Sequence, residues 1–353
     1  MCGRWAGSGY PETFRILFLD IQAYLCLRAW PDIVLNLLYL QKSFLWQNVY
    51  NRWPARCRLP AIEYFVVTFL HSVHQKKGSM RMSGIDFRVQ KLFRGKRNLV
   101  ISAVDHVVEY GDQPGLEQAK PAIRNCLGTD ALLLPCFMLR RNGKLLSGPR
   151  APVPVVRINW SASFYYPLGY REGCTAITTT VAEAVQAGAG AVICSLFLEE
   201  EDRQRETENV RLFSEVVRQK EQLGIPLIGE AYVVEHAEKT PEEVHLKVKR
   251  VSRIMAELGA DLVKTFYTGE RFHEVVENTP VPVFTIGAEK LDTDLAVLEK
   301  AADSVNQGAR GIIFGRNIFM AKNPPALVRA LNEVINKGVS PQEAAAKLAT
   351  QGE

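Results

Sequence analysis

The stretch VPVFTIGAEKLDTDLAVLEKAADSVNQGARGIIFGRNIF, residues 281–319, predicts one strand–helix–strand unit. Two short apolar runs, 281–287 and 311–317, flank a segment whose apolar residues recur every three or four positions. That segment, 292–308, starts at an aspartate and ends at a glycine, so we expect a helix with an Asp cap. A helix between two buried strands is typical of parallel pairing.

The same unit recurs along the chain. Helix-like segments at 178–189, 199–224 and 240–259 each contain or end on a glycine stop, and the last begins Thr-Pro-Glu-Glu, a common helix start. Eight alternating strands and helices favour a closed (β/α)8 TIM barrel of the α/β class over an open doubly wound sheet. No GxGxxG follows the first run, and the chain has no P-loop. The eight predicted strands are 99–106, 131–139, 153–159, 191–198, 226–232, 261–267, 281–287 and 311–317.

Composition excludes some function classes. The 353 residues are 47% hydrophobic and 23% charged, which is ordinary for a globular protein. The net charge of +5 comes from residues 1–80, and the remainder carries equal numbers of basic and acidic residues, so we expect no nucleic-acid partner. Seven cysteines without a CxxC pair predict reduced thiols and a cytoplasmic location.

Residues 1–80 differ from the rest and contain four of the five tryptophans. Asp20, Arg28 and Asp32 interrupt their apolar run, so we expect neither a transmembrane helix nor a signal peptide. We interpret 1–80 as an atypical N-terminal extension and a gene-model artefact, with Met80 or Met82 as the start, and 81–353 as the barrel domain. A membrane-surface or interaction segment is the alternative.

A lysine interrupts the strand DLVKTFYTG, residues 261–269. Lys264 either reaches solvent from a strand end or is buried, where a lowered pKa makes the amine a nucleophile. Such an amine can attack a carbonyl to form a Schiff base. At neighbouring strand ends, Tyr232 is placed to move a proton, and Glu230 could instead pair with Lys264 and hold it charged.

Three further strand ends bear on this chemistry. Asp105 could assist dehydration of a carbinolamine, or bond to loop N–H groups as a structural carboxylate. His106 either contacts substrate or caps a turn. Gly287 and Gly315, with Arg316 and Lys290, predict a phosphate site after the last two strands, although each glycine could simply permit a tight turn.

Four motifs carry a resemblance to a known family: GADLVKTFYTG (259–269), PVPVFTIGAEKL (280–291), QGARGIIFGRNIF (307–319) and the DH pair at 105–106. Together they resemble the class I aldolases of archaeal and bacterial type, over about residues 84–348. That family includes fructose-1,6-bisphosphate aldolases, an aldol-type synthase of archaeal aromatic biosynthesis, and a thiolase acting on phosphorylated autoinducer-2 breakdown products. The resemblance implies a (β/α)8 barrel, no metal or other cofactor, and a homo-oligomer.

The resemblance also implies residue roles. Lys264 would be the Schiff-base lysine, Tyr232 the proton-transfer tyrosine and Asp105 the strand-one acid, and the phosphate grip would fall on Gly287, Ala288, Gly315 and Arg316. The family commonly has Tyr-Pro-Arg-Gly where this chain has Tyr-Val-Val-Glu at 232–235, which removes a cation from the far end of the substrate. Ala288 stands where a second glycine is usual, and the tryptophan that some aldolases place before the tyrosine is absent.

We therefore expect a metal-free, Schiff-base aldolase acting on a phosphorylated ketose, most simply fructose 1,6-bisphosphate, without a membrane partner. A thiolase, acyltransferase or aldol-type synthase acting on another phosphorylated keto compound is one alternative. The thiolase-like member lacks the tyrosine, so Tyr232 favours an aldolase. A non-catalytic barrel that binds sugar phosphates is the second alternative. A metal-dependent aldolase is disfavoured because the strand ends carry no His/Asp/Glu cluster beyond Asp105 and His106.

Overall fold

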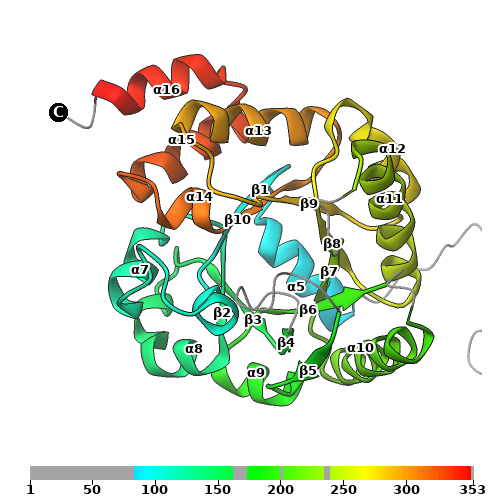
Figure 1. Cartoon of the computed structure of the whole chain (residues 1–353). Helices are drawn as coiled ribbons and strands as arrows, with labels where there is room; N and C mark the ends of the chain where they lie inside the picture. The colour runs from blue at the N-terminus through cyan, green and yellow to red at the C-terminus, as the bar shows by residue number, and fades with distance from the viewer. Residues whose placement is uncertain (1–82, 162–172, 199–201, 234–238, 351–353) are drawn as a thin grey trace, which may run out of the picture. The chain divides into compact units, whose positions relative to one another are not determined.

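Eight parallel strands close into a barrel in the computed structural model, which describes residues 83–161, 173–198, 202–233 and 239–350 (Figure 1). Neighbouring strands around the ring follow the order β1-β10-β9-β8-β7-β6-β3-β2, and β2 pairs with β1 to close it. The predicted (β/α)8 barrel is thus confirmed. Its strands are β1 (Leu99–Ala103), β2 (Ala131–Pro135), β3 (Val153–Arg157), β6 (Ala191–Phe197), β7 (Leu227–Tyr232), β8 (Leu262–Thr265), β9 (Val283–Ile286) and β10 (Gly311–Phe314).

Helices form the outer ring around these strands (Figure 1). A separate two-stranded antiparallel sheet, β4 (Asn159–Ser161) and β5 (Thr175–Ile177), follows β3. The helices are α5 (Gly84–Phe93), α6 (Val107–Tyr110), α7 (Ala119–Asn125), α8 (Cys136–Asn142), α9 (Val181–Ala187), α10 (Arg203–Leu223), α11 (Pro241–Glu257), α12 (Phe272–Asn278), α13 (Asp294–Asn306), α14 (Arg316–Phe319), α15 (Pro324–Lys337) and α16 (Pro341–Thr350).

Helix boundaries follow local chemistry. Thr240 caps α11 through a capping box with Glu243, and the left-handed Gly224 ends α10, as the sequence predicts. The Asp cap expected for α13 is wrong, because the Thr293 hydroxyl accepts the bond from the Ala296 N–H instead.

Every barrel strand is shorter than the apolar run that predicted it, and two runs illustrate the reason. In the run 131–139 the strand ends at Pro135 and α8 begins at once, and the run 153–159 divides between β3 and β4. A continuous apolar run does not distinguish a buried strand from a buried helix segment, so its boundaries stay ambiguous in the sequence.

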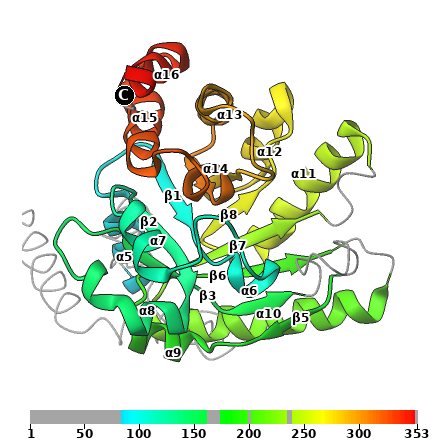
Figure 2. The same ribbon diagram turned by 60° about the vertical axis from the view of Figure 1, so that its left-hand side comes forward.

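The core has two layers. Inward side chains fill the barrel, and a larger cluster packs between the strands and the helices. Helix α5 packs against the amino end of the barrel (Figure 2). There Leu92 is 1% exposed, and the Phe93 and Phe284 rings lie 6.2 Å apart. The loops that carry the candidate site lie at the carboxyl end of the barrel.

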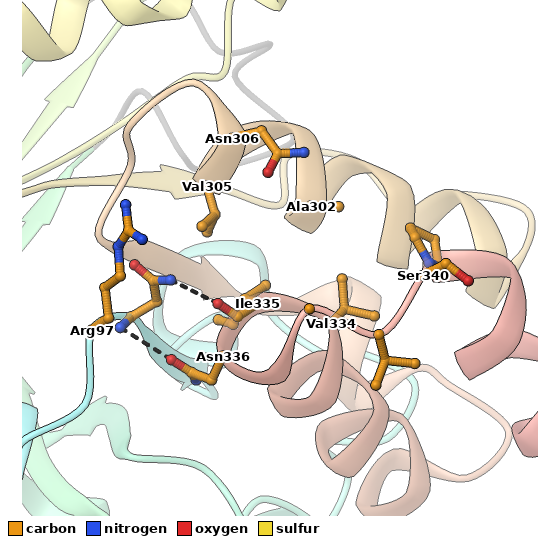
Figure 3. Close-up of a pocket in the computed structure, with 12 residues that line it drawn as sticks. Arg97, Ala302, Val305, Asn306, Val334, Ile335, Asn336 and Ser340 are labelled. Carbon is orange, nitrogen blue, oxygen red and sulfur yellow. Dashed lines mark hydrogen bonds between the residues drawn. The ribbon is translucent and has the colours of Figure 1, made fainter.

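A cavity of about 470 Å³ lies at the amino end of the barrel, between the loop before β1, the end of α13 and the α15–α16 connection (Figure 3). Its polar lining includes Arg97, Asn98, Asn306 and Asn336. The Asn98 amide donates to the Ile335 carbonyl at 2.7 Å, and its backbone N–H donates to Asn336 Oδ1 at 3.1 Å. None of the predicted site residues lines this cavity.

The predicted extension, residues 1–80, lies outside the described residues, as do Val234 and Glu235 of the departure after β7. Within the described ranges, no helix is both long and apolar enough to cross a membrane. The four cysteines there (Cys126, Cys136, Cys174 and Cys194) are free thiols.

Candidate active site

Lys264 lies inside the barrel rather than at a solvent-facing strand end. It is in register with Glu230 on the adjacent strand β7, and both side chains face inward. Lys264 is 7% exposed, and its ammonium forms an ion pair with Glu230 Oε1. The pairing of Lys264 with Glu230, which the sequence left as an alternative, is therefore present.

Arg157, at the end of β3, organises the carboxylates around this lysine. Its Nε donates to Asp105 Oδ2, and its two terminal nitrogens donate to Ser195 Oγ and Glu230 Oε2, each at 2.9 Å. The Ser195 hydroxyl also donates to Glu230 Oε2 at 2.5 Å. Side chains from five barrel positions thus meet in one buried network. Breaking one partner of such a network leaves an uncompensated buried charge.

The network holds two carboxyls ionised. Burial alone would raise the pKa of Glu230, but Arg157, Lys264 and the bonds from Lys264 and Ser195 outweigh it and lower the pKa to about 2. Burial also opposes ionisation of Asp105, and Arg157, with help from His106 and Lys264, holds that pKa well below its usual range. Both groups are therefore anions at neutral pH.

Glu109, on the short helix α6, adds a third carboxyl. It is 4% exposed, and its Oε1 lies 3.3 Å from Arg157 Nε without hydrogen-bond geometry. Burial, with repulsion from Asp105 and Glu230, raises the pKa of Glu109 to about 8 despite the opposing charges of Arg157 and Lys264. Neither composition nor spacing marks this residue in the sequence.

His106 lies on the rim beside Asp105, with its Nδ1 3.4 Å from Asp105 Oδ1. Its ring stacks on Tyr110 and meets the edge of Phe319, and burial lowers its pKa, so it is neutral at pH 7. Gly315 is required by this packing, because a Cβ there would lie 2.2 Å from His106 Cε1. Gly315 therefore leaves the space that the His106 ring occupies.

Tyr232 is two residues beyond Glu230 on β7, on the same inward face and nearer the carboxyl end of the barrel. Its ring packs against Phe197 at 5.8 Å and Phe266 at 5.1 Å between centroids. The predicted proton-transfer tyrosine therefore belongs to an aromatic cluster above the charged network.

The loops after β9 and β10 are tied together where the phosphate site is predicted. Asn317 donates to the carbonyls of Gly287 at 3.1 Å and Glu289 at 3.0 Å, and accepts from the Leu291 N–H at 2.8 Å. Lys300 donates to the Gly287 carbonyl at 3.0 Å, and burial lowers its pKa. These bonds fix the backbone of the predicted phosphate turn.

The other residues predicted to bind phosphate, Ala288, Arg316 and Lys290, differ in their surroundings. Ala288 has a left-handed backbone with φ 55°, a conformation that costs a non-glycine residue roughly 1 kcal/mol. Arg316 lies over the Tyr110 ring at 5.7 Å, and its buried Nε has no hydrogen-bond partner. Lys290 instead donates to the Leu291 carbonyl at 2.8 Å.

The sequence prediction missed several residues that organise the site. Arg157 interrupts the apolar run VPVVRIN as Lys264 interrupts its own, so the same signal could have found it. Glu109, Ser195 and Lys300 have no such signal, because their roles depend on contacts between distant segments. Over the described ranges, no group of three or more His, Cys, Asp or Glu side chains could hold a metal ion.

Comparison with known proteins identifies relatives of this chain. The sequence model of the DeoC/LacD family aldolases matches residues 99–321. An uncharacterised aldolase of Saccharolobus solfataricus is 31% identical over 272 residues, covering 74% of this chain and 98% of that protein. A 3-hydroxy-5-phosphonooxypentane-2,4-dione thiolase of Enterobacter sp. strain 638 is 29% identical over 264 residues, covering 74% of this chain and 84% of the other.

Among solved structures, an archaeal fructose 1,6-bisphosphate aldolase superposes with a TM-score of 0.59 at 25% identity, covering 70% of this chain and 98% of the other. The closed barrel and the match to aldolase sequences are those of a lyase-type barrel enzyme. The chain belongs to the DeoC/LacD family of aldolases.

Proposed function

We propose that the protein is a class I aldolase that makes or breaks a carbon–carbon bond in a phosphorylated ketose through a Schiff base on Lys264. Fructose 1,6-bisphosphate is the simplest substrate. The observation that carries the proposal is the placement of a 7%-exposed lysine in the barrel interior, paired with Glu230 and next to the Asp105–Arg157 pair. A lysine that a carboxylate holds inside the barrel is placed to attack a carbonyl as the free amine.

The proposed mechanism gives each group one task. Lys264 loses its ammonium proton to solvent and attacks the ketone carbon as the free amine, the resulting imine withdraws electrons from the bond that breaks, and Glu230 holds the lysine in place. Tyr232 moves the proton of the substrate hydroxyl, and Asp105 orients substrate through its fixed place on Arg157. The phosphate is held by Arg316 and by the turn of Gly287, Ala288 and Gly315.

Borohydride reduction in the presence of dihydroxyacetone phosphate tests the lysine. The imine becomes a stable amine, and peptide mass spectrometry should place the adduct on Lys264. Lys264→Met should form no adduct, whereas Lys347→Met, which removes an exposed lysine on α16, should trap as the wild type does. A wild type without an adduct, or with one on another lysine, contradicts the proposal.

The second candidate is transfer chemistry on another phosphorylated keto compound, favoured by the 29% identical relative named as a thiolase. The same trapping assay with a panel of phosphorylated ketones, followed by product analysis, separates the two candidates. Release of an aldehyde indicates an aldolase, and transfer of an acyl group to a thiol indicates a thiolase.

A further inference from the structure

Three carboxyl groups surround one guanidinium in the barrel, and one of them has a buried oxygen without a hydrogen bond. Arg157 donates to Asp105 from Nε and to Glu230 from a terminal nitrogen. Glu109 Oε1 lies 3.3 Å from the same Nε, yet it is buried with no hydrogen-bond partner. A buried carboxylate in this position would be poorly compensated.

The charges of the neighbouring groups also disfavour an ionised Glu109. Arg157 and Lys264 carry the two positive charges of the cluster, and Asp105 and Glu230 carry the two negative ones, so the four groups are neutral together. His106, the other titratable group on the Asp105 loop, is neutral at pH 7 because burial lowers its pKa. An ionised Glu109 would leave one excess negative charge in the barrel.

The surroundings of the two glutamates beside Arg157 therefore shift their pKa values in opposite directions. The pKa of Glu230 is lowered to about 2, whereas burial raises the pKa of Glu109 to about 8. Titratable groups whose pKa values are pushed apart within one site are the usual mark of an acid and a base. The geometry connects Glu109 to the lysine through Arg157, which lies 3.3 Å from Glu109 Oε1 and donates to Glu230, the ion-pair partner of Lys264.

We propose that Glu109 is the proton donor for dehydration of the carbinolamine on Lys264, an inference that rests on the proposed Schiff-base function. The lysine nitrogen supplies its lone pair to form the C=N bond as the C–O bond breaks, and the oxygen leaves as water with the proton of Glu109. The Glu109 carboxylate that remains lies beside Arg157. Hydrolysis of the imine runs the same step in reverse and returns the proton to Glu109, so no other reagent is consumed.

Other groups of the site are less suited to this proton. Asp105 is ionised and already accepts from Arg157, and Glu230 is ionised between Arg157, Ser195 and Lys264. Tyr232 lies in the aromatic cluster with Phe197 and Phe266, where it serves the substrate hydroxyl in the proposed mechanism.

The protonation of Glu109 can be tested without any substrate. Glu109→Gln keeps the shape and neutrality of the protonated acid. The folded wild type keeps this proton up to about pH 8, whereas the unfolded chain releases it near the ordinary glutamate pKa of 4.5. The stability of the wild type should therefore fall relative to Glu109→Gln as the pH rises between these values. Glu117→Gln, at an exposed carboxylate in the following loop, should show no such trend, and parallel curves for the wild type and Glu109→Gln overturn the assignment of the proton.

Use of the proton is tested by the rate at which dihydroxyacetone phosphate forms a borohydride-reducible imine, measured from about pH 6 to about pH 9. Loss of a general acid should slow Glu109→Gln by about 100-fold or more and remove the alkaline fall that the wild type shows near pH 8. Equal rates and equal pH profiles overturn the donor role while the Schiff base stands. A wild type that forms no imine at any pH refutes the Schiff-base function and the donor role with it, and the stability curves still report where the proton lies.

Discussion

At the scale of single residues, Arg157 is the group on which the interior charges depend. It contacts Asp105, Ser195 and Glu230, which come from three other parts of the ring, and it is 5% exposed. Removing one partner from a buried ion cluster costs about 3–5 kcal/mol because the others keep their charges without compensation. The residue therefore supports both the fold and the proposed chemistry.

Arg157→Met should lower the free energy of unfolding by about 3–5 kcal/mol at pH 7, and by less as the pH falls. In the wild type the depressed pKa of Glu230, about 2 against an ordinary value of 4.5, gives stability that is present above about pH 4.5 and lost as the pH falls toward 2. Urea denaturation at several pH values measures the difference. The matched control Arg253→Met removes an exposed i,i+4 pair with Glu257 and should cost under about 1 kcal/mol. Equal losses in both variants would contradict this account.

Arg157 illustrates which residues of the site could be predicted from the sequence. A charged side chain within an apolar run is visible in the sequence, and Lys264 was found on that basis, as Arg157 could have been. Glu109 lies in an ordinary polar stretch after β1, and its importance depends on β3, β7 and β8 facing it across the closed ring. Contacts between segments so far apart leave no periodic pattern in the chain.

At the scale of elements, two short helices at the carboxyl end of the barrel support the predicted phosphate turn. Helices α6 and α14 follow the adjacent strands β1 and β10, and His106 meets Phe319 between them with ring centroids 5.1 Å apart. The long helices were predictable from caps and spacing, whereas one-turn helices are too short for a periodic signal. The predicted phosphate turn is therefore held by elements that the sequence did not indicate.

The capping box of α11 gives an element-scale prediction. Thr240→Ala removes the side-chain acceptor of the Glu243 N–H, and it should lower the free energy of unfolding by about 1 kcal/mol with the trapping activity unchanged. Thr207→Ala, on the exposed face of α10, removes only a bond back to the Arg203 carbonyl and should change stability little. Thermal unfolding of both variants measures the cap, and a larger loss from Thr207→Ala would refute the reasoning.

At the scale of the whole molecule, all eight strands and the helix that closes the amino end lie between residues 84 and 350. Helix α5 begins with its own capping box, Ser83 with Asp86, so its start needs no contribution from residues before 83. The inward packing of Leu92 and Phe93 makes this helix part of the barrel.

A chain that begins at Met82 should therefore keep the melting temperature and the imine trapping of the full-length protein. A chain that begins at Gly95 should be clearly less stable, because it lacks α5 and exposes the interior that Leu92 covers. Thermal unfolding of the three chains compares them directly. A loss of stability on removing residues 1–81 would show that the extension belongs to the folded unit.

The distribution of charge along the chain has a consequence for how the barrel assembles. The first four barrel strands carry the Asp105–Arg157 pair, and the last four carry the Glu230–Lys264 pair. Each of these two ion pairs is neutral within its own half of the ring. When the halves meet, Arg157 of one pair contacts Glu230 of the other, and Glu109 takes up a proton as the site is buried, so closing the ring removes one proton from solution near neutral pH.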